Sequence, residues 1–241
     1  MKNKRNITRT SLILSAVITS LITLNWPGNC GLNRPAVNRL ANHLHTDWRK
    51  GFGRDISRQN KYNHFIRKAL NRWPLMDPYI LKSLLIQESN LSAKRINKYG
   101  YAGIAQIGRR EAKTAGISAA ERLDAEKAIM ACVEILKDKS LKLSQNSFRK
   151  YGTPQGEEYW KFIVAAYNAG EGTIARALRI AYGTDRPKQI TFNDLVTSTT
   201  GNPKDAPLYK ALSRRWNRKA KFREISEFAT NILARAGQRD K

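Results

Sequence analysis

The sequence has little cysteine, few acidic residues and no long apolar run, and the first and last of these shortages exclude whole classes of protein. Its two cysteines, Cys30 and Cys132, are too few for a disulfide framework, and they could form a four-ligand zinc site only with other donors. The 15 glycines and 8 prolines among 241 residues exclude a collagen-like chain, while 41% hydrophobic residues are enough to close a core. A mean hydropathy of -0.55 excludes a membrane-embedded helix bundle.

Acidic residues are outnumbered, because 19 Asp and Glu face 44 Lys and Arg, which gives a formal net charge of +25. The basic excess is spread along the whole chain and is not confined to one segment. A spread positive charge suits any extended polyanion, including nucleic acid, anionic lipid and a bacterial cell wall. Charge alone does not choose among these partners.

The first 30 residues have the pattern of an export signal. A basic stretch at residues 2–9 precedes an uncharged apolar run at residues 11–24, which is short for a membrane-spanning helix. Residues 25–26 could extend the run to 11–26, so a cleaved signal and a retained inner-membrane anchor both remain open, and Cys30 follows a poor lipoprotein motif. We therefore expect the body of the protein outside the cytoplasmic membrane, in the periplasm or cell envelope.

Residues 31–73 are predicted to form a basic connecting segment with some helix near 61–71. His43 and His45 form an H-x-H pair here, but no carboxylate or cysteine cluster accompanies them, so we predict no metal site. From residue 74 to 241 we predict one domain. Apolar residues recur at helical spacing in segments at 121–143, 158–168, 173–182 and 208–236, and no convincing strand pattern occurs. This domain is predicted to be all-α.

Glu88 is the first candidate for chemistry. Asp77 and Pro78 provide a cap and a first-turn proline for a helix on which Leu81 and Leu84 lie seven and four residues before Glu88. The carboxylate therefore shares the inward face of the helix, where burial raises its pKa and makes it a proton donor near neutral pH. A glutamate at the edge of an apolar stripe, paired with a basic residue, is the simpler structural explanation. The residue alone does not decide between them.

Three strings supply the context for Glu88: LLIQESN at residues 84–90, YGYAGIAQI at 99–107 and AAYNAGEG at 165–172. In this order and spacing they closely resemble the catalytic domain of the soluble lytic transglycosylases, glycoside hydrolase family 23, which has the goose-type lysozyme fold. Weaker similarities, in segments that begin at residues 124, 191 and 223, extend the resemblance over roughly residues 74–236.

The resemblance implies a peptidoglycan lytic transglycosylase that cleaves the MurNAc-GlcNAc β-1,4 bond without water and needs no cofactor. Glu88 would act first as acid and then as base, while the 6-hydroxyl of the muramic acid closes a 1,6-anhydro ring and the N-acetyl group assists. Glycosidases ordinarily use two carboxylates, and the other two strings contain only Glu171. A hydrolytic muramidase on the same fold is the alternative.

The same resemblance assigns the residues that bind the substrate. It implies that Tyr167 hydrogen-bonds the catalytic carboxylate and that Asn168 contacts the sugar near the cleaved bond. Gln106, in a loop with Gly103, matches a glycan-binding glutamine, and Ser89 matches the serine after the catalytic glutamate. Core packing and helix-end hydrogen bonds are the alternative roles of Ser89, Tyr167 and Asn168.

The chain departs from the family pattern at several positions. Ala105 stands where methionine is usual, which removes an apolar wall beside the sugar. Lys127, Ala131 and Cys132 depart from the pattern of the middle helix, and Phe228 replaces a tyrosine. The apolar run around Cys132 predicts a buried, unreactive thiol.

Basic and aromatic residues alternate at 214–223 without any acidic residue. This stretch could bind single-stranded nucleic acid, but we favour the solvated face of a helix, with anionic wall polymers as its partner. Peptidoglycan glycan strands are the expected substrate, and no specific nucleic acid is expected. An answer of another class is a non-catalytic cationic protein that binds wall polymer or nucleic acid.

Overall fold

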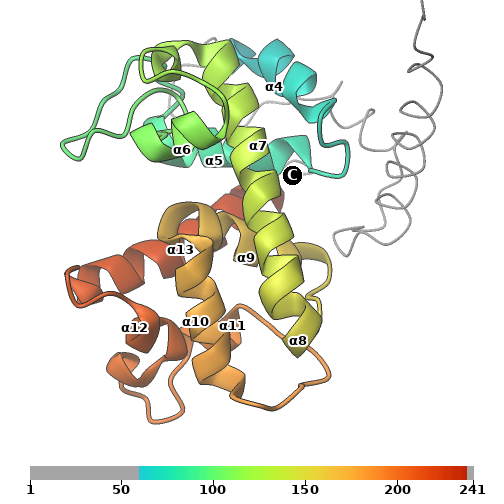
Figure 1. Ribbon diagram of the computed structural model, residues 1–241, viewed down its shortest axis with the longest axis vertical. Helices are drawn as coiled ribbons and strands as arrows, with labels where there is room; N and C mark the ends of the chain where they lie inside the picture. Colours follow the sequence, from blue (N-terminus) through green and yellow to red (C-terminus); the bar gives the residue numbers. More distant parts are fainter. Residues whose placement is uncertain (1–59, 238–241) are drawn as a thin grey trace, which may run out of the picture.

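The computed structural model describes residues 60–237 (Figure 1). The expected signal or anchor at 1–30, the pair His43 and His45, and Cys30 lie outside the described residues. No helix within residues 60–237 is long and apolar enough to span a membrane.

The described part is mainly helical and contains no sheet, as predicted. Its only β-structure is a set of isolated bridges that join Ile96 to Ala102 and Ala102 to Ile107. The helices are α4 (Asn63–Leu70), α5 (Pro78–Ser89), α6 (Arg109–Thr114), α7 (Ala125–Leu143), α8 (Arg149–Tyr151), α9 (Gly156–Ala169), α10 (Glu171–Tyr182), α11 (Asn193–Val196), α12 (Pro207–Ala211) and α13 (Arg218–Ala236). Short 3-10 turns occur at Glu121–Leu123 and Pro203–Asp205, and a π-helical turn at Ser144–Phe148.

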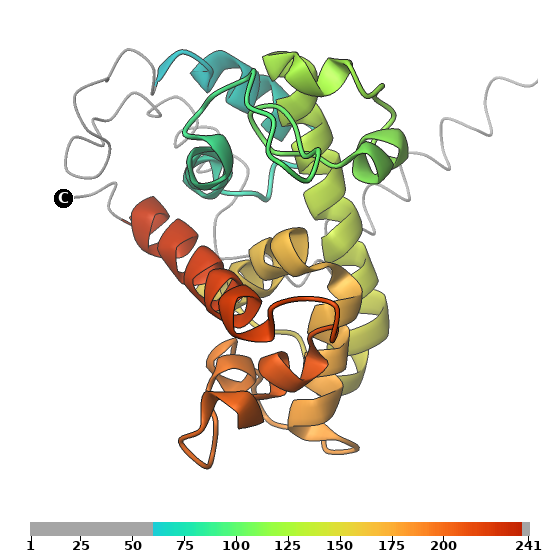
Figure 2. The ribbon, with the colours of Figure 1, turned by 90° about the vertical axis from the view of Figure 1, so that its left-hand side faces the viewer.

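Helix α7 runs between the two ends of the molecule (Figures 1 and 2). One end holds α4, α5 and α6, and the other holds α10, α11 and α12. Helix α13 packs against α5, which carries most of the string at 84–90, and against α9, which carries the first part of the string at 165–172. The C-terminal helix therefore lies beside both strings.

The predicted start of α5 is confirmed. The Asp77 side chain accepts a hydrogen bond of 2.8 Å from the backbone N–H of Tyr79, and Pro78 occupies the first turn. Capping satisfies a backbone donor that has no partner inside the helix. The helix buries Leu81, Leu84 and most of its other residues, so α5 is held on nearly all sides.

Helix α4 belongs to the same hydrophobic core. Ile66 and Ala69 are fully buried, Trp73 is nearly so, and α4 packs against α7. The helix confirms the helical part predicted near 61–71. The core therefore begins before residue 74, inside the range expected to be a connecting segment, because apolar residues there recur at helical spacing among the basic ones.

The apolar pattern predicted at 208–236 forms two helices. Helix α12 ends at Ala211, and Leu212 has an extended backbone with ψ 142. Helix α13 begins after Asn217, whose side chain accepts a hydrogen bond of 3.1 Å from the N–H of Ala220. An asparagine cap between the two apolar stretches starts a new helix here.

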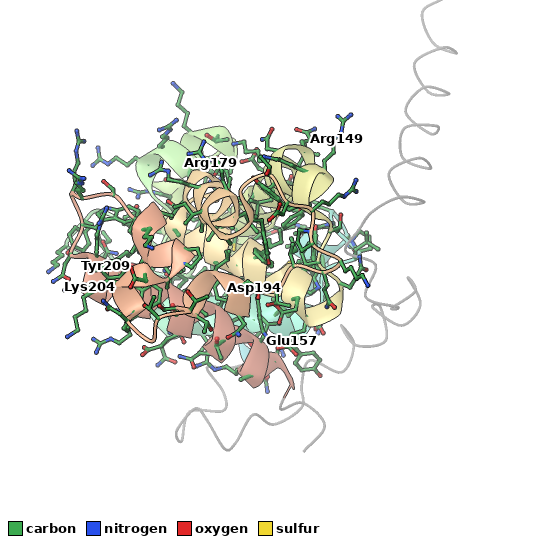
Figure 3. All side chains as sticks on the ribbon, turned by 90° about the horizontal axis from the view of Figure 1, so that it is seen from below. Arg149, Glu157, Arg179, Asp194, Lys204 and Tyr209 are labelled. Carbon is green, nitrogen blue, oxygen red and sulfur yellow. The ribbon has the colours of Figure 1, made fainter. Side chains whose placement is uncertain are left out.

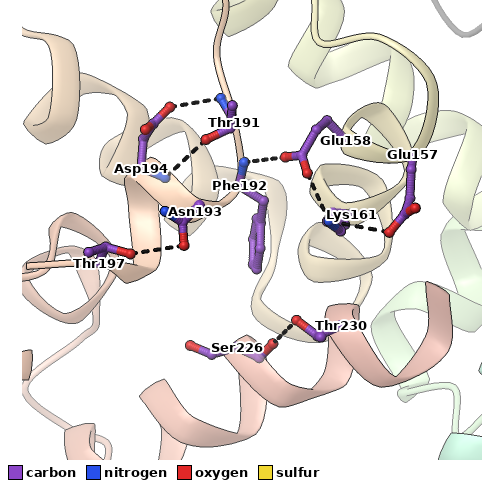
Figure 4. A network of polar contacts seen from close by, with 10 residues as sticks. All are labelled: Glu157, Glu158, Lys161, Thr191, Phe192, Asn193, Asp194, Thr197, Ser226 and Thr230. Atoms are coloured by element: carbon purple, nitrogen blue, oxygen red, sulfur yellow. Dashed lines mark hydrogen bonds and ion pairs between the residues drawn. The ribbon is translucent and has the colours of Figure 1, made fainter. Parts of the chain in front are cut away.

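A polar network joins the segment before α11 to α9 (Figure 4). The carboxylate of Glu158 accepts a hydrogen bond of 2.5 Å from the N–H of Phe192, whose ring packs edge-on against Phe162. Thr191 and Asp194 exchange hydrogen bonds between side chain and backbone at 2.8 and 3.3 Å. Charged side chains such as Arg149, Arg179 and Lys204 point outward from this end of the molecule (Figure 3).

Candidate active site

Glu88 lies in the last turn of α5, at the point where the chain leaves the helix. The helix ends there because Asn90 and Leu91 adopt left-handed backbone angles, with φ 53 and 58. The Glu88 side chain is half-buried, and within residues 60–237 its carboxylate makes no hydrogen bond or ion pair. Its polar atoms are therefore available to a substrate.

The environment of Glu88 favours the protonated acid. The pKa of Glu88 is raised to about 8, mainly by burial and secondly by the nearby Glu224 carboxylate, whereas the cations of Lys221 and Arg95 oppose the rise. Loss of water destabilises the ionised form more than the neutral one, and a like charge acts in the same direction. At pH 7 the side chain therefore holds a proton that it can donate.

Ser89 connects the end of α5 to the loop at 99–107. Its hydroxyl donates to the carbonyl of Ile104 at 2.7 Å and accepts from the N–H of Ser92 at 3.0 Å. The side chain is almost fully buried. Ser89 therefore fixes the distance between the helix that carries Glu88 and the adjacent loop, and its predicted contact with substrate stays a prediction.

Gly103 is required by the close approach of two backbone segments. It has φ +81, and a Cβ atom at this position would lie 1.7 Å from the carbonyl oxygen of Arg122. Its N–H donates to the carbonyl of Arg95 at 2.8 Å. Only glycine combines this backbone conformation with this contact. The close backbone contact in the loop thus explains why the residue at position 103 is glycine.

Arg122 holds the same loop from outside and was not identified from the sequence. Its guanidinium is buried and donates to three backbone carbonyls: Gly100 at 2.7 Å, Ile107 at 2.8 Å and Ala119 at 2.9 Å. One rigid cation thereby adds to the isolated bridges at Ala102 in holding the loop.

Gln106 turns its side chain into the loop. Its amide nitrogen donates to the carbonyl of Arg95 at 3.1 Å and to that of Gly103 at 2.9 Å, and the residue is buried with φ 48. Both amide protons are therefore used inside the protein. The structure gives Gln106 a role in shaping the loop, and glycan binding stays a prediction for its remaining oxygen.

The hydroxyl of Tyr167 donates to the carbonyl of Ala105 at 2.7 Å. This differs from the hydrogen bond to Glu88 that the family resemblance implies, because a phenol has one proton and the loop carbonyl accepts it. Burial raises the pKa of Tyr167 well above its usual range, and Cys132 and then Glu88 add to the rise. Glu88 is therefore still close to the Tyr167 hydroxyl. Tyr167 thus links the end of α9 to the loop beside the acid.

Cys132 is fully buried, as predicted. Burial raises the pKa of its thiol to about 12. A thiol in this environment stays protonated and unreactive at neutral pH. It packs behind the site and offers no nucleophile.

Asn168, Lys221 and Glu224 form a closed triangle of hydrogen bonds across α9 and α13. The ammonium of Lys221 donates to Asn168 Oδ1 at 2.9 Å and to Glu224 Oε1 at 2.7 Å, while Asn168 Nδ2 donates to Glu224 Oε1 at 3.0 Å. Glu224 also acts on Glu88 through its charge, so it is a second carboxylate within electrostatic reach, and the sequence strings did not reveal it. By contrast, Glu171 pairs with Lys139 and Lys142 on α7.

The sequence model of the Transglycosylase SLT domain family matches residues 65–190, which is more than half of the chain. The chain therefore belongs to the Transglycosylase SLT domain family. Members are typically lytic transglycosylase enzymes, so membership implies transglycosylase activity on peptidoglycan. No curated protein matches the chain significantly.

Proposed function

We propose that the protein is a peptidoglycan lytic transglycosylase that cleaves the MurNAc-GlcNAc β-1,4 bond without water, with Glu88 as general acid and then general base. The observation that carries this proposal is the raised pKa of Glu88, about 8, on a carboxyl group that no protein group within residues 60–237 binds. Such a group is protonated at pH 7 and free to meet the oxygen of a glycosidic bond.

The proposed reaction has two proton transfers. Glu88 first gives its proton to the glycosidic oxygen, so the bond to the anomeric carbon breaks and the GlcNAc-side chain leaves with a hydroxyl. The N-acetyl oxygen of the muramic acid stabilises the positive anomeric carbon. The ionised Glu88 then takes the proton of the muramic acid 6-hydroxyl, whose oxygen bonds to the anomeric carbon and closes the 1,6-anhydro ring. Atoms and charge balance without water.

The environment of Glu88 also favours the second transfer. After the first step, two carboxylates, Glu88 and Glu224, carry negative charge near each other, and Glu88 is half-buried. The same burial and repulsion that raise the pKa of Glu88 make its carboxylate a stronger base. One residue can therefore serve both steps.

A hydrolytic muramidase is the second candidate, and the position of Glu224 favours it. Glycosidases that use water ordinarily need a second carboxylate, and Glu224 lies within electrostatic reach of Glu88. However, the Glu224 carboxylate is already engaged by Lys221 and Asn168. This engagement supports a structural role for Glu224, which the transglycosylase proposal requires.

Mass spectrometry of digested peptidoglycan sacculi tests the proposal. The purified full-length protein is expected to release muropeptides with 1,6-anhydro ends, and Glu224→Gln is expected to release the same products more slowly. Reducing ends that disappear in Glu224→Gln would assign a hydrolytic muramidase. No products from the folded wild-type protein would assign a non-catalytic cationic binding protein.

We further propose that the protein acts outside the cytoplasmic membrane, as the signal-like pattern of residues 1–30 and a peptidoglycan substrate both suggest. The net charge of +25 suits attachment to the anionic wall. Detection of the full-length protein in periplasmic or membrane fractions, and not in the cytosol, tests this location.

A further inference from the structure

Lys221 occupies a different setting from the other cations at the start of α13. Its side chain is 20% exposed, and its ammonium lies 5.6 Å from the centre of the Trp216 ring. Neighbouring Lys219 is exposed, with no ion pair among the described residues. A cation held between an aromatic ring, an amide oxygen and a carboxylate is fixed in position, whereas a solvated lysine is not.

We propose that Lys221 is a positioning residue of the active site, which orients the Asn168 amide so that one N–H of that amide points to the substrate. This inference rests on the proposed function, because it assigns Asn168 a substrate contact. In the sequence, Lys221 was only one of several basic residues in the stretch at 214–223.

The hydrogen-bond pattern fixes which way the Asn168 amide faces. Lysine has only donors, so the Asn168 atom that meets Lys221 must be the amide oxygen. An ionised carboxylate has only acceptors, so the atom that meets Glu224 must be the amide nitrogen. Both contacts give the same orientation. They use the oxygen and one N–H, which leaves the second N–H as the group that Asn168 can offer to a sugar oxygen.

Lys221 also acts on Glu88 through charge. The charged groups that shift the pKa of Glu88 are Glu224 and Lys221 on α13 and Arg95 in the loop after α5. The other titratable groups around it are neutral at pH 7: Tyr101 in the loop at 99–107, Cys132 on α7 and Tyr167 on α9, whose own pKa values the Glu88 charge raises. Lys221 partly cancels the repulsion by Glu224. Removal of Lys221 would leave the Glu224 charge opposed only by Arg95, and it would free the Asn168 amide to rotate.

The test compares Lys221→Met with Lys221→Arg and with the control Lys219→Met. The first readout is the titration of Glu88, followed by NMR of 13C-labelled glutamate carboxyl groups and assigned with Glu88→Gln. In Lys221→Met the pKa of Glu88 is expected to rise by about 0.5 to 1 pH unit. Lys221→Arg keeps the charge and should restore the wild-type titration, and Lys219→Met should leave it unchanged.

The second readout is the KM for short soluble glycan fragments, measured separately from kcat. Loss of the charge-assisted contact to Asn168 is expected to raise KM about tenfold in Lys221→Met. The wild-type titration in Lys221→Met, or a shifted titration with unchanged KM, would overturn the proposal. If Lys221→Met does not fold, Lys221→Gln is measured by the same criteria.

The titration does not depend on turnover, so it separates this inference from the proposed function. A wild-type protein that makes no 1,6-anhydro product would overturn the proposed function, while the Glu88 titration would still report whether Lys221 acts on the acid. In that case binding of chitooligosaccharide replaces KM, and an unchanged Kd in Lys221→Met would overturn the orientation of Asn168.

Discussion

Glu88→Gln is expected to stabilise the folded protein at alkaline pH while it abolishes cleavage. The folded pKa is about 8 and the ordinary value is 4.5. Below pH 4.5 both the folded and the unfolded chain hold the proton, so Glu88 adds no pH dependence. Between pH 4.5 and 8 the unfolded chain releases a proton that the folded chain keeps, so rising pH favours unfolding.

The size of this effect follows from the same difference. At about 1.4 kcal/mol per pH unit, a folded pKa near 8 instead of 4.5 costs on the order of 5 kcal/mol of folding free energy above pH 8. The side chain is half-buried, so solvent screens part of this cost, and we expect about 2 to 5 kcal/mol. Glutamine keeps the shape of the side chain and carries no charge, so the variant does not incur this cost.

Urea denaturation at several pH values from 4 to 9 measures the effect. The free energy of unfolding of Glu88→Gln minus that of the wild type should increase through this range and level off above pH 8. Glu157→Gln, which removes an exposed glutamate from α9, is the matched control. A difference that stays constant with pH would refute the argument that the site keeps Glu88 protonated.

Cleavage of sacculi by Glu88→Gln should fall by at least about 100-fold, and activity near that of the wild type would remove Glu88 from the mechanism.

Two further predictions concern the loop at 99–107. Gly103→Ala should cost more than about 3 kcal/mol of unfolding free energy and most of the activity, because its Cβ would collide with the Arg122 carbonyl. Gly100 has a similar φ, but a Cβ atom there would meet no atom within 4 Å, so Gly100→Ala should cost only about 1 kcal/mol of unfolding free energy. Equal costs for the two variants would refute the collision at Gly103. Arg122→Met should cost about 2 to 4 kcal/mol in urea denaturation, because three carbonyls lose their donor. The exposed Arg109→Met is its control and should change stability by less than about 0.5 kcal/mol, and similar losses in both would show that Arg122 does not hold the loop.

Local signals in the sequence were sufficient to locate the helix that carries Glu88. The cap at Asp77, the proline at 78 and the apolar spacing before Glu88 act within one helix, so they can be interpreted without knowledge of the fold. The same holds for the end of α9, where Gly170 has φ 82 and separates α9 from α10. These features depend on neighbours that are near in sequence.

The partners of the site residues could not be predicted in the same way. Asn168 meets Lys221 and Glu224 across 53 and 56 residues, and that contact exists only because α13 packs against α9. Arg122 had no sequence signal, since a buried arginine looks like any other basic residue in a chain with a net charge of +25. Tyr167 illustrates the same limit, because its hydroxyl donates to the carbonyl of Ala105, 62 residues away in the sequence.

The tight backbone contact between Gly103 and Arg122 has a consequence for how this enzyme can change. Main-chain contacts, the buried guanidinium of Arg122 and the inward amide of Gln106 determine the shape of the loop, so the outward side chains on it have little part in maintaining that shape. Tyr99 and Tyr101 are such side chains, 75% and 42% exposed. Mutation can therefore sample new residues at these two positions while Glu88 and its supports stay in place. Under the proposed function, this makes the loop a natural starting point for evolving or engineering a different glycan preference.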